Sequence, residues 1–552
     1  MITVSNVKLK VGHNVYDLRD KISKELQLKS IFKDRTVPDY SIEVIRKSLD
    51  ARRKPELFLI YSLRLSFDED AEARIKAAYL KHRFDRSRID ISFAEPKEYV
   101  IPACGAKSLT NRPVIIGSGP AGMFAALLLS RRGFKPIIVE RGECVDDRIS
   151  TVEQIFNSGE ISVNSNVQFG EGGAGTFSDG KLNTMTKDPV GRHGFIMDTF
   201  AMMGADESVR YLAKPHVGTD KLVDVVRNIR HEVIEHGGEY LFNTQAVGFE
   251  FTNDAVSGVR IRRDGAEEVI STNQCILAIG HSARDTFEML YNIGMKMEAK
   301  DFAVGFRVSH LQSTINKCQY GSEEVEGLGA ADYKFTHTCQ NGRRVYSFCM
   351  CPGGYVVNAS SEQGRMAVNG MSYYDRASGY ANSAIVCAVT KEDYGYEGNP
   401  LSGMYYQRDI EEKAYEAGGG FGCIPVQRLA DYIAGIKRSE FGRIKPMTKG
   451  TCMPSDLNGI FSKEIKDAIV ESIEKIGYTM EGFADDDTLL FGVESRTSSP
   501  IRIPRNNRFQ ADYEGLYPCG EGAGYAGGIT SAAADGMKVA EYIIENYYPD
   551  YN

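Results

Sequence analysis

The sequence predicts an α/β fold with a parallel sheet at its centre. The strand Val114–Ile116 is apolar at every position, as strands covered on both faces are. Three glycines follow it within six residues and lead into a segment rich in small residues. A second apolar strand, residues 136–139, comes one helix length later and ends at Glu140. Strand, glycine-rich turn, helix and strand together indicate a βαβ unit.

Length and composition are those of a folded chain of two or three domains. The chain has 552 residues, of which 42% are hydrophobic and 25% charged. Its formal net charge of −8, without a long basic run, argues against a nucleic-acid partner. We find neither a signal peptide nor an apolar run of the ~18 residues that a membrane helix needs. With eleven cysteines, an odd number, this predicts reduced thiols in a cytoplasmic protein without a membrane partner.

Residues 1–98 are expected to form a module of their own. Hydrophobic periodicity predicts strands and helices in the order β-α-β-β-α-β, which indicates a small ferredoxin-like α+β domain. Such a fold carries no information on function. Residues 96–112 are predicted as a linker. The expected strands are residues 4–10, 41–51, 57–67 and 89–93, and the expected helices are 15–28 and 71–82.

The glycine triplet has the spacing of a dinucleotide-binding turn. Gly117 permits a tight turn out of the strand, and Gly119 lets the backbone approach a pyrophosphate. Gly122 allows the helix to pack closely on the strand. The helix N-terminus, beginning with Pro120 and Ala121, then faces the anion. These residues predict a Rossmann-type domain.

The end of the second strand and the later segments complete this domain. Glu140, followed by Arg141, is placed to accept hydrogen bonds from ribose hydroxyls, and its charge disfavours a 2′-phosphate. Further elements are expected at residues 221–236 (helix), 239–270 (β-meander), 274–279 (strand) and 512–547 (strand, glycines and helix). The predicted boundaries are 111–300 and 486–552 for the two parts of the Rossmann-type domain, and 301–485 for an inserted mixed α+β substrate domain.

Motifs in three distant places resemble those of the glutathione-reductase-like flavoproteins. The resemblance implies FAD as the cofactor, with Gly280 near the dinucleotide. It also places Gly520 and Glu521 at the flavin ribityl chain, where most members carry Asp instead of Glu. Gly528 and Ile529 would begin a helix whose first amides point at the flavin. The similar segments are residues 117–123 with 137–142, residues 275–280 and residues 515–524.

A glycine-rich segment, residues 169–183, falls where relatives without a nicotinamide domain run a loop beside the flavin. Its small residues permit close backbone approach, and its hydroxyl and carboxylate groups offer hydrogen bonds to flavin N5 or the ribityl hydroxyls. A flexible surface loop is the alternative. The cofactor contacts expected here and in the meander are Gly173, Ala174, Gly175, Thr176, Ser178, Asp179 and Val247.

Over nearly its whole length the chain resembles a bacterial family of FAD-dependent, NAD(FAD)-utilising dehydrogenases. That resemblance implies the fold and the cofactor but no reaction, because the family's substrate is unassigned. The matching motifs are residues 214–220, 280–285, 348–356, 369–372 and 492–500.

No second strand–glycine–helix unit for a nicotinamide nucleotide is predicted, so NAD(P)H could visit the flavin only as a transient donor. The chain also lacks the Cys-x4-Cys pair of disulfide reductases beside its glycine motif. Cys349 and Cys351 are its only close cysteine pair in the sequence. Reduced thiols near a buried turn are the favoured interpretation, and a redox or substrate role is the alternative.

Arginines are candidates to hold an anionic substrate, because guanidinium groups bind carboxylates bidentately. Arg496, which three hydroxyl side chains follow, is the first choice, and Arg284 and Arg307 come next. Arg376 and His310 are further candidates. A structural or solvated side chain is the alternative for each of them.

Two histidines are candidates to move protons near neutral pH. His281 directly follows the second glycine strand, and His216 lies in a Pro-His turn. A packed, hydrogen-bonded histidine is the alternative for both. No metal site is predicted, because the histidines lack paired ligand spacing with cysteines. Those considered are His193, His216, His231 and His236.

The predicted function is that of an FAD-dependent oxidoreductase, a dehydrogenase or reductase that transfers hydride between an unidentified small molecule and FAD. One alternative is a flavin-containing RNA-modifying or RNA-binding protein that reads RNA with its N-terminal module, which the acidic net charge weakens. The other is a non-catalytic flavin-binding protein.

Overall fold

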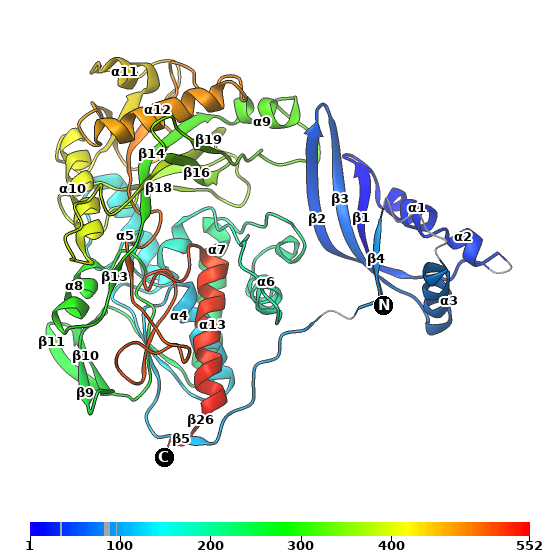
Figure 1. The fold of residues 1–552 in the computed structure, drawn as a ribbon, viewed down its shortest axis with the longest axis horizontal. Coiled ribbons are helices and arrows are strands. Elements are labelled where there is room, and N and C mark those ends of the chain that lie inside the picture. The colour runs from blue at the N-terminus through cyan, green and yellow to red at the C-terminus, as the bar shows by residue number, and fades with distance from the viewer. Residues whose placement is uncertain (34–35, 82–88, 95–96, 552) are drawn as a thin grey trace.

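An N-terminal unit lies beside a larger body with two sheets (Figure 1) in the computed structural model, which describes residues 1–33, 36–81, 89–94 and 97–551. The elements of this unit are β1 (Ile2–Lys10), α1 (Val15–Glu25), α2 (Leu28–Ile31), β2 (Ser41–Arg53), β3 (Glu56–Ser66), α3 (Glu69–Leu80) and β4 (Asp90–Ser92). The strands form one antiparallel sheet in the order β2-β3-β1-β4. The predicted order of elements is confirmed, with α2 as an addition. His82, the expected end of a helix, lies outside the described residues.

A five-stranded parallel sheet forms the centre of the body. In spatial order its strands are β25 (Leu516–Pro518), β12 (Cys275–Leu277), β6 (Val114–Ile116), β7 (Ile137–Val139) and β8 (Glu239–Leu241). Every neighbouring pair is parallel. The strands β6, β12 and β25 are buried at every position, which explains their unbroken apolar sequences.

Helices cover one face of this sheet and a β-meander covers the other. The helices on the first face are α4 (Pro120–Arg131), α6 (Arg192–Met202), α7 (Thr219–Glu235) and α13 (Ile529–Asn546). On the other face lie β9 (Thr244–Thr252), β10 (Ala255–Arg263), β11 (Ala266–Ser271) and α8 (Arg284–Asn292). α5 (Val145–Ser158) contacts α7. The segment predicted as a meander is therefore divided, because residues 239–241 join the parallel sheet as β8.

Glycines allow close backbone contacts at the turn between β6 and α4. Gly117 has φ +99°, and a Cβ there would lie 2.4 Å from the carbonyl oxygen of Ala278. A Cβ on Gly122 would lie 1.9 Å from the Gly117 oxygen, and one on Gly536 in α13 would lie 2.0 Å from the Ala121 oxygen. Because α4 packs this closely on its own strand and on α13, both helices begin at the same edge of the sheet.

A seven-stranded sheet forms the other half of the body. In spatial order its strands are β15 (Thr336–Thr338), β16 (Arg344–Cys351), β19 (Tyr380–Val389), β14 (Phe302–Leu311), β23 (Leu489–Glu494), β20 (Ile424–Arg428) and β22 (Cys452–Pro454). The helices around it are α9 (Gln312–Tyr320), α10 (Ser402–Ala417), α11 (Leu429–Ala434) and α12 (Lys463–Gly477). Smaller sheets join β17 (Tyr355–Asn358) to β18 (Val368–Met371) and β21 (Thr448–Lys449), and β13 (Glu298–Ala299) to β24 (Ile501–Arg502).

The predicted boundary at residue 485 is wrong. Strand β23 comes from the stretch that we assigned to the Rossmann-type domain, yet it pairs with β14 and β20 inside the seven-stranded sheet. It is buried at every position. A fully apolar strand suits the centre of either sheet, so its sequence does not say which sheet it enters.

The second half of the predicted linker contains a short strand that pairs with the C-terminal strand. β5 (Lys107–Leu109) pairs in parallel with β26 (Tyr547–Pro549), beside the C-terminus (Figure 1). Pro96, where the predicted linker starts, lies outside the described residues. The N-terminal unit also contacts the body through its edge strand β2. There the Lys47 amide donates to Tyr211 O at 2.7 Å, and the Lys47 oxygen accepts from the Ala213 amide at 2.9 Å.

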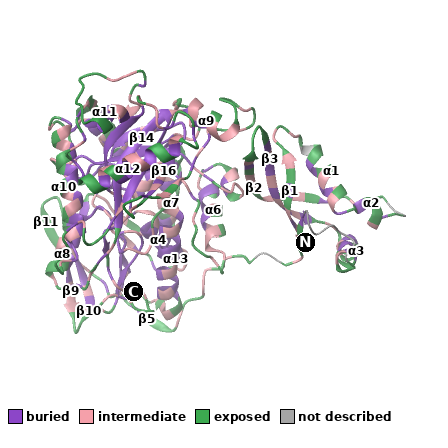
Figure 2. Ribbon diagram, turned by 45° about the horizontal axis from the view of Figure 1, so that its top comes forward, coloured by how far each residue is buried: buried purple, intermediate pink, exposed green. Residues whose placement is uncertain are grey.

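Buried residues concentrate in the two sheets of the body and along α13, as Figure 2 shows. The N-terminal unit has a separate apolar cluster between its sheet and its helices. Within the described ranges, no helix has both the length and the apolar character to cross a membrane.

The tight packing at Gly122 predicts the effect of adding one methyl group. Gly122→Ala places a Cβ against the Gly117 oxygen and should destabilise the fold by about 1–3 kcal/mol through overpacking, measured as a lower midpoint of thermal unfolding. Gly194→Ala is the control, because this glycine lies in α6 with no atom within 4 Å of an added Cβ. Equal midpoints for the two variants would contradict the packing argument.

Candidate functional site

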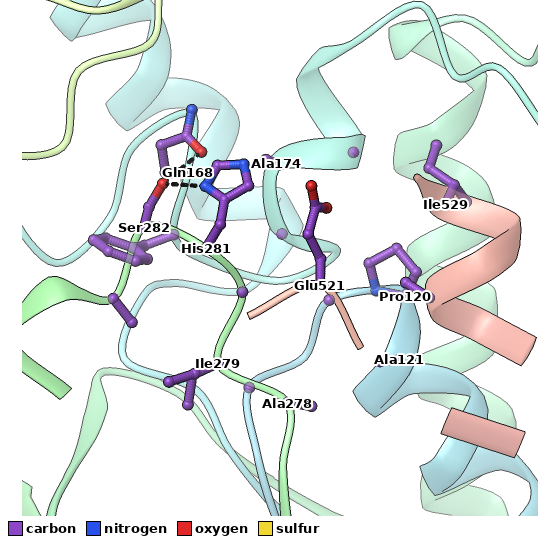
Figure 3. Close-up of a pocket in the computed structure, with 18 of the residues that line it drawn as sticks. Pro120, Ala121, Gln168, Ala174, Ala278, Ile279, His281, Ser282, Glu521 and Ile529 are labelled. Atoms are coloured by element: carbon purple, nitrogen blue, oxygen red, sulfur yellow. Dashed lines mark hydrogen bonds between the residues drawn. The ribbon is translucent and has the colours of Figure 1, made fainter. Parts of the chain in front are cut away.

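A cavity of about 360 Å³ lies where the carboxyl ends of the parallel strands meet the seven-stranded sheet. Its walls come from the turn after β6, the residues after β12, the start of α13 and the short 3₁₀ helix η1 (Gly173–Phe177), part of which Figure 3 shows. From the second sheet, Phe348 and Glu494 reach the same space. The carboxyl edge of a parallel sheet is where α/β folds bind ligands.

Two helices aim uncapped N-termini at this cavity. The N-cap residues are Gly119 for α4 and Gly528 for α13, and no side chain caps the first amides of either helix. Unpaired amides at a helix start carry partial positive charge and attract anions. Two such ends on one cavity favour a ligand with negative or electron-rich groups in two places.

Neither the backbone conformation nor the packing of the protein requires a glycine at position 119. Its φ of −70° is open to any residue, and the atom nearest to an added Cβ is Gly173 Cα at 3.9 Å. At Gly527 and Gly528 there is also room for a side chain, because no atom lies within 4 Å of an added Cβ. The room beside these glycines opens to the cavity, so the cradle fits a pyrophosphate that backbone amides approach closely.

Glu140 is buried in the cavity wall and holds the surrounding loops. Its Oε2 accepts from the Ser118 amide at 2.9 Å and from the Ser118 hydroxyl at 2.8 Å. Its Oε1 accepts from the amides of Gly142 and Gly170 at 3.0 and 3.1 Å. The expected hydrogen bond from a ribose hydroxyl to Glu140 stays a prediction. To form it, the ribose hydroxyl would have to share Glu140 Oε2 with the Ser118 hydroxyl or displace it.

Glu521 points into the cavity (Figure 3), and its carboxylate has no hydrogen-bond partner among the described residues. Burial raises its pKa to about 7, and the charge of Lys300 opposes the shift. A carboxylate without a protein partner can accept hydrogen bonds from ligand hydroxyls. This is the role that the resemblance gives to Glu521.

Most residues predicted to bind the cofactor line this cavity. The exceptions are Gly122, Val247, Thr176 and Gly520, which do not line the cavity, although Gly122 has the helix-packing role that the glycine triplet predicts for it. Gly122 packs inside α4, and Thr176 donates to a backbone carbonyl at 3.2 Å. Ala246 lines the cavity, and the next side chain along the strand, Val247, does not. Gly520 has φ +72° in the turn after β25. The predicted residues that do line it are Gly117, Gly119, Pro120, Ala121, Glu140, Arg141, Gly173, Ala174, Gly175, Ser178, Asp179, Gly280, Glu521, Gly528 and Ile529.

Arg496 lines the cavity, but buried groups engage its guanidinium. Its Nε and Nη2 donate to Glu411 at 3.0 and 2.9 Å, and Nη1 donates to Ser361 at 2.6 Å. Arg284 donates to the same carboxylate at 2.7 and 2.8 Å and lies outside the cavity wall. Although burial opposes the charge of Glu411, the two guanidiniums hold its pKa well below its usual range. The expectation that Arg284 holds a substrate is therefore wrong.

Arg307 is fully buried and joins strands instead of facing the cavity. Its Nε donates to Glu494 at 2.9 Å, and its Nη1 donates to Asn382 at 2.7 Å. These bonds link β14 to β23 and to β19. His310 is buried in the same sheet and bonds to the carbonyl oxygen of Phe483 at 2.7 Å. Neither side chain lines the cavity, so neither has the predicted substrate contact.

Asp179 lines the cavity with its carboxylate bound to the protein. Arg376 donates to it at 2.6 and 3.0 Å, and the Ser372 hydroxyl donates at 2.6 Å. The Lys181 ammonium lies 3.4 Å away. Burial opposes the charge of Asp179, but Lys181 and Arg376 hold its pKa well below the usual range. Asp179 therefore organises the wall instead of offering a free acceptor to the flavin.

His281 lines the cavity as a neutral group. Its Nδ1 lies 2.8 Å from the Ser282 hydroxyl, which donates to Gln168 Oε1 at 3.0 Å (Figure 3). Burial lowers the pKa of His281 to about 3, with neighbouring arginines adding to the shift. His216 lies outside the cavity wall, and burial lowers its pKa to about 4. Burial disfavours the charged form of both histidines, and the proton transfer expected of them stays a prediction.

Two charged residues of the cavity wall, Lys181 and Glu494, were not among the predicted site residues, and a role for Cys349 was considered only as an alternative. Lys181 lies in the glycine-rich segment already singled out, so its position was a usable signal. Glu494 and Cys349 reach the cavity only because β23 and β16 end there. Nothing in the local sequence of these two strands indicates that position.

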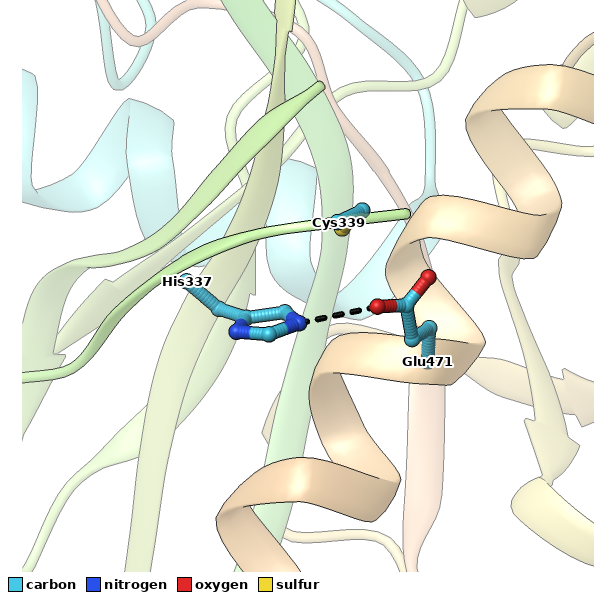
Figure 4. A group of neighbouring side chains, drawn as sticks. All are labelled: His337, Cys339 and Glu471. Atoms are coloured by element: carbon cyan, nitrogen blue, oxygen red, sulfur yellow. Dashed lines mark hydrogen bonds and ion pairs between the residues drawn. The ribbon is translucent and has the colours of Figure 1, made fainter. Parts of the chain in front are cut away.

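Away from the cavity, His337, Cys339 and Glu471 come together between β15 and α12 (Figure 4), with one potential ligand atom from each within 4.8 Å of the others. His337 Nε2 lies 2.9 Å from Glu471 Oε1, and Cys339 Sγ lies 3.4 Å from the Ala468 oxygen. The sequence indicated no metal site, because Glu471 is far along the chain. Each donor atom has a protein partner, and these bonds hold α12 against the sheet.

Two family models match the chain. Residues 111–290 match the model described as pyridine nucleotide-disulphide oxidoreductase, and residues 301–497 match the one described as FAD-dependent protein, C-terminal domain-like. An uncharacterised protein of Clostridium beijerinckii is 41% identical over 549 residues, which cover 99% of each chain.

The chain is also similar to solved structures at low identity. One is the glycerol-3-phosphate dehydrogenase of Bacillus halodurans complexed with FAD, with 12% identity, a TM-score of 0.36, and coverage of 78% of this chain and 64% of that one. Another is a geranylgeranyl bacteriochlorophyll reductase-like protein of Thermoplasma acidophilum, with 12% identity, a TM-score of 0.34, and coverage of 79% and 78%.

The parallel sheet, the glycine cradle at its carboxyl edge and the two family matches define a flavoprotein of the Rossmann-like α/β class. The chain belongs to the same family as the Clostridium protein, a family of FAD-dependent oxidoreductases, and FAD is its cofactor. The cavity fits this cofactor through Gly119, the two uncapped helix ends and Glu521.

A charge placed in the cradle should expel FAD without unfolding the protein. In Gly119→Asp the new Cβ has room, but its carboxylate faces the pyrophosphate. The repulsion should weaken FAD binding about a hundredfold or more, measured by fluorescence titration, while the apoprotein keeps its unfolding midpoint. Gly119→Ala is the matched control and should lose less affinity. Yellow Gly119→Asp protein would count against the cradle.

The raised pKa of Glu521 predicts a pH-dependent gain in stability for the apoprotein of Glu521→Gln. Ionising the Glu521 carboxyl in the folded protein lowers the free energy of unfolding. This loss is absent below the ordinary pKa of 4.5, where the carboxyl is protonated in both the folded and the unfolded chain, and it grows as pH rises to about 7. The variant should therefore unfold at a higher temperature than wild type at about pH 8, and the difference should vanish near pH 4.5. A difference independent of pH would exclude this explanation.

Proposed function

We propose that this protein is an enzyme that transfers hydride between a small organic molecule and FAD. The supporting observation is that one cavity runs from the glycine cradle to the seven-stranded sheet, where Phe348 and Glu494 line it, and Asn369 of β18 lines it too. Bound FAD supplies reversible two-electron chemistry. The part of the cavity under the second sheet gives a substrate a place beside the cofactor, shielded from water.

Lys181 is the residue that we propose to hold an anionic part of the substrate, in place of the arginines. The residue lines the cavity. Its ammonium is buried, has no hydrogen-bond partner among the described residues and lies 3.4 Å from Asp179. The arginines in this region already bind buried carboxylates, and moving one would leave such a carboxylate unpaired. Lys181 can bind an acceptor without breaking a hydrogen bond.

Glu494 is the proposed proton carrier of the cavity wall. Burial raises its pKa, although the charge of Arg307 opposes the shift. A carboxyl group with a raised pKa can hold a proton nearer neutral pH than an exposed one. His281, whose imidazole stays neutral, contributes a hydrogen-bonding group through Ser282 instead.

Anaerobic reduction tests the proposed function. NADH and NADPH are added separately to the holoprotein without oxygen, and the loss of visible flavin absorbance is followed, then its return on admitting oxygen. Reduction and reoxidation over repeated cycles are expected with at least one donor, which would act as a transient substrate. A flavin that neither donor nor a panel of small organic reductants bleaches would favour a non-catalytic flavin-binding protein.

A further inference from the structure

Two cysteines lie in a bulge where β16 reaches the cavity. The pairing of β16 with β19 shifts register between Phe348 and Cys351. Cys349, inside this shift, has φ +43°, in the left-handed region that residues other than glycine seldom adopt. Bulges beside active sites re-aim side chains. Here Cys349 lines the cavity, while Cys351 is fully buried behind it.

The bulge brings the two cysteines within reach of a disulfide. On an extended strand, Cα atoms two residues apart are separated by about 6.8 Å, which is the upper end of the about 4.4–6.8 Å that disulfides span. The Cys351 thiol lies 3.4 Å from the carbonyl oxygen of Cys349, and the two side chains interact directly.

Cationic groups surround the pair. Arg307 donates from Nη1 to the Cys349 oxygen at 3.0 Å, and the same nitrogen lies 3.9 Å from Cys351 Sγ. Lys181 lines the cavity with Cys349. Glu494 and Asp179 partly balance these charges. The hydrogen bond from Cys351, with the charges of Arg307 and Lys181, holds the pKa of Cys349 below its usual range, although burial opposes this shift. The same hydrogen bond, together with burial, raises the pKa of Cys351 although the two cations oppose the rise.

Cys519, the other cysteine of the cavity wall, has a different environment. It is fully buried, and burial with the neighbouring Asp535 raises the pKa of its thiol. Cys349 is partly exposed to the cavity. A reactive thiol needs accessibility, stabilisation of its thiolate and a second thiol to resolve its oxidised form. Cys349 with Cys351 meets all three conditions.

We propose that Cys349 and Cys351 form a redox-active pair that exchanges two electrons with FAD in the cavity. In the reducing direction, the disulfide between them takes up two electrons and one proton from the reduced cofactor. The S–S bond breaks, Cys349 keeps one electron pair as a thiolate, and Cys351 receives the proton as a thiol. The reverse step reforms the bond and returns the electrons to oxidised FAD. This inference rests on the proposed redox function of the cavity.

Peptide mapping and electron counting test the pair on the holoprotein. Protein oxidised with diamide, a thiol oxidant, is denatured so that the buried Cys351 becomes accessible, alkylated with N-ethylmaleimide and digested. The peptide with both cysteines should be unlabelled and lighter by two hydrogens, and dithiothreitol should make both thiols available for labelling. In an anaerobic dithionite titration, oxidised wild type should take up two more electrons per FAD than Cys351→Ser. Cys104→Ser, which changes an exposed thiol, should match wild type.

The outcomes separate this inference from the proposed function. If both cysteines are labelled after oxidation, or if wild type and Cys351→Ser take up equal numbers of electrons, the pair is not redox-active, whatever donor reduces the flavin. If the extra electrons appear while no organic donor bleaches the flavin, the pair stands and the proposed hydride donors fail. FAD content and circular dichroism of Cys351→Ser, with Cys351→Ala as a second variant, establish that the variants fold.

Discussion

The close contact of α4 with strand β6 and with α13 is the constraint on which the cavity depends. Gly117, Gly122 and Gly536 each place a backbone oxygen within 2.4 Å of where a Cβ would stand, so no other residue fits these positions without moving the backbone. The contact fixes both helix starts at the carboxyl edge of the sheet. Their unpaired amides then share one cavity, where partial positive charge can meet the anionic and electron-rich groups of FAD.

Buried ion pairs form the opposite wall. Glu411 accepts hydrogen bonds from both Arg284 and Arg496. Arg307 donates to Glu494 and also to residues of β16, β18 and β19. Such pairs add little net stability, but removing one partner leaves a buried charge uncompensated. Through its bonds to Cys349 O and to Glu494, Arg307 therefore holds the ends of β16 and β23 at the cavity. Cys349, Glu494 and Lys181, to which we assign the proposed chemistry, line the cavity there.

Features carried by short contiguous segments could be predicted from the sequence. The turn from Gly117 to Gly122, the acidic end of the next strand at Glu140 and the helix from Ile529 each depend on neighbours within one βαβ unit or one helix. The seven-stranded sheet could not be divided correctly, because β14 pairs with β23, about 180 residues later. Strand pairing over such a distance leaves no local signal beyond an apolar run.

The sequence by itself determined the class of the fold and the edge of the sheet that binds the cofactor, because backbone conformation and periodicity are local properties. The identity of the cofactor followed from the resemblance of its motifs to those of a flavoprotein family. Only the tertiary structure decided which charged side chains face the cavity. Arg284 and Arg307 have the same chemistry as a substrate-binding arginine, but the carboxylates that bind them, Glu411 and Glu494, are more than a hundred residues away. A side chain's role depends on the partner that folding places beside it, and that partner is set by packing across the whole chain.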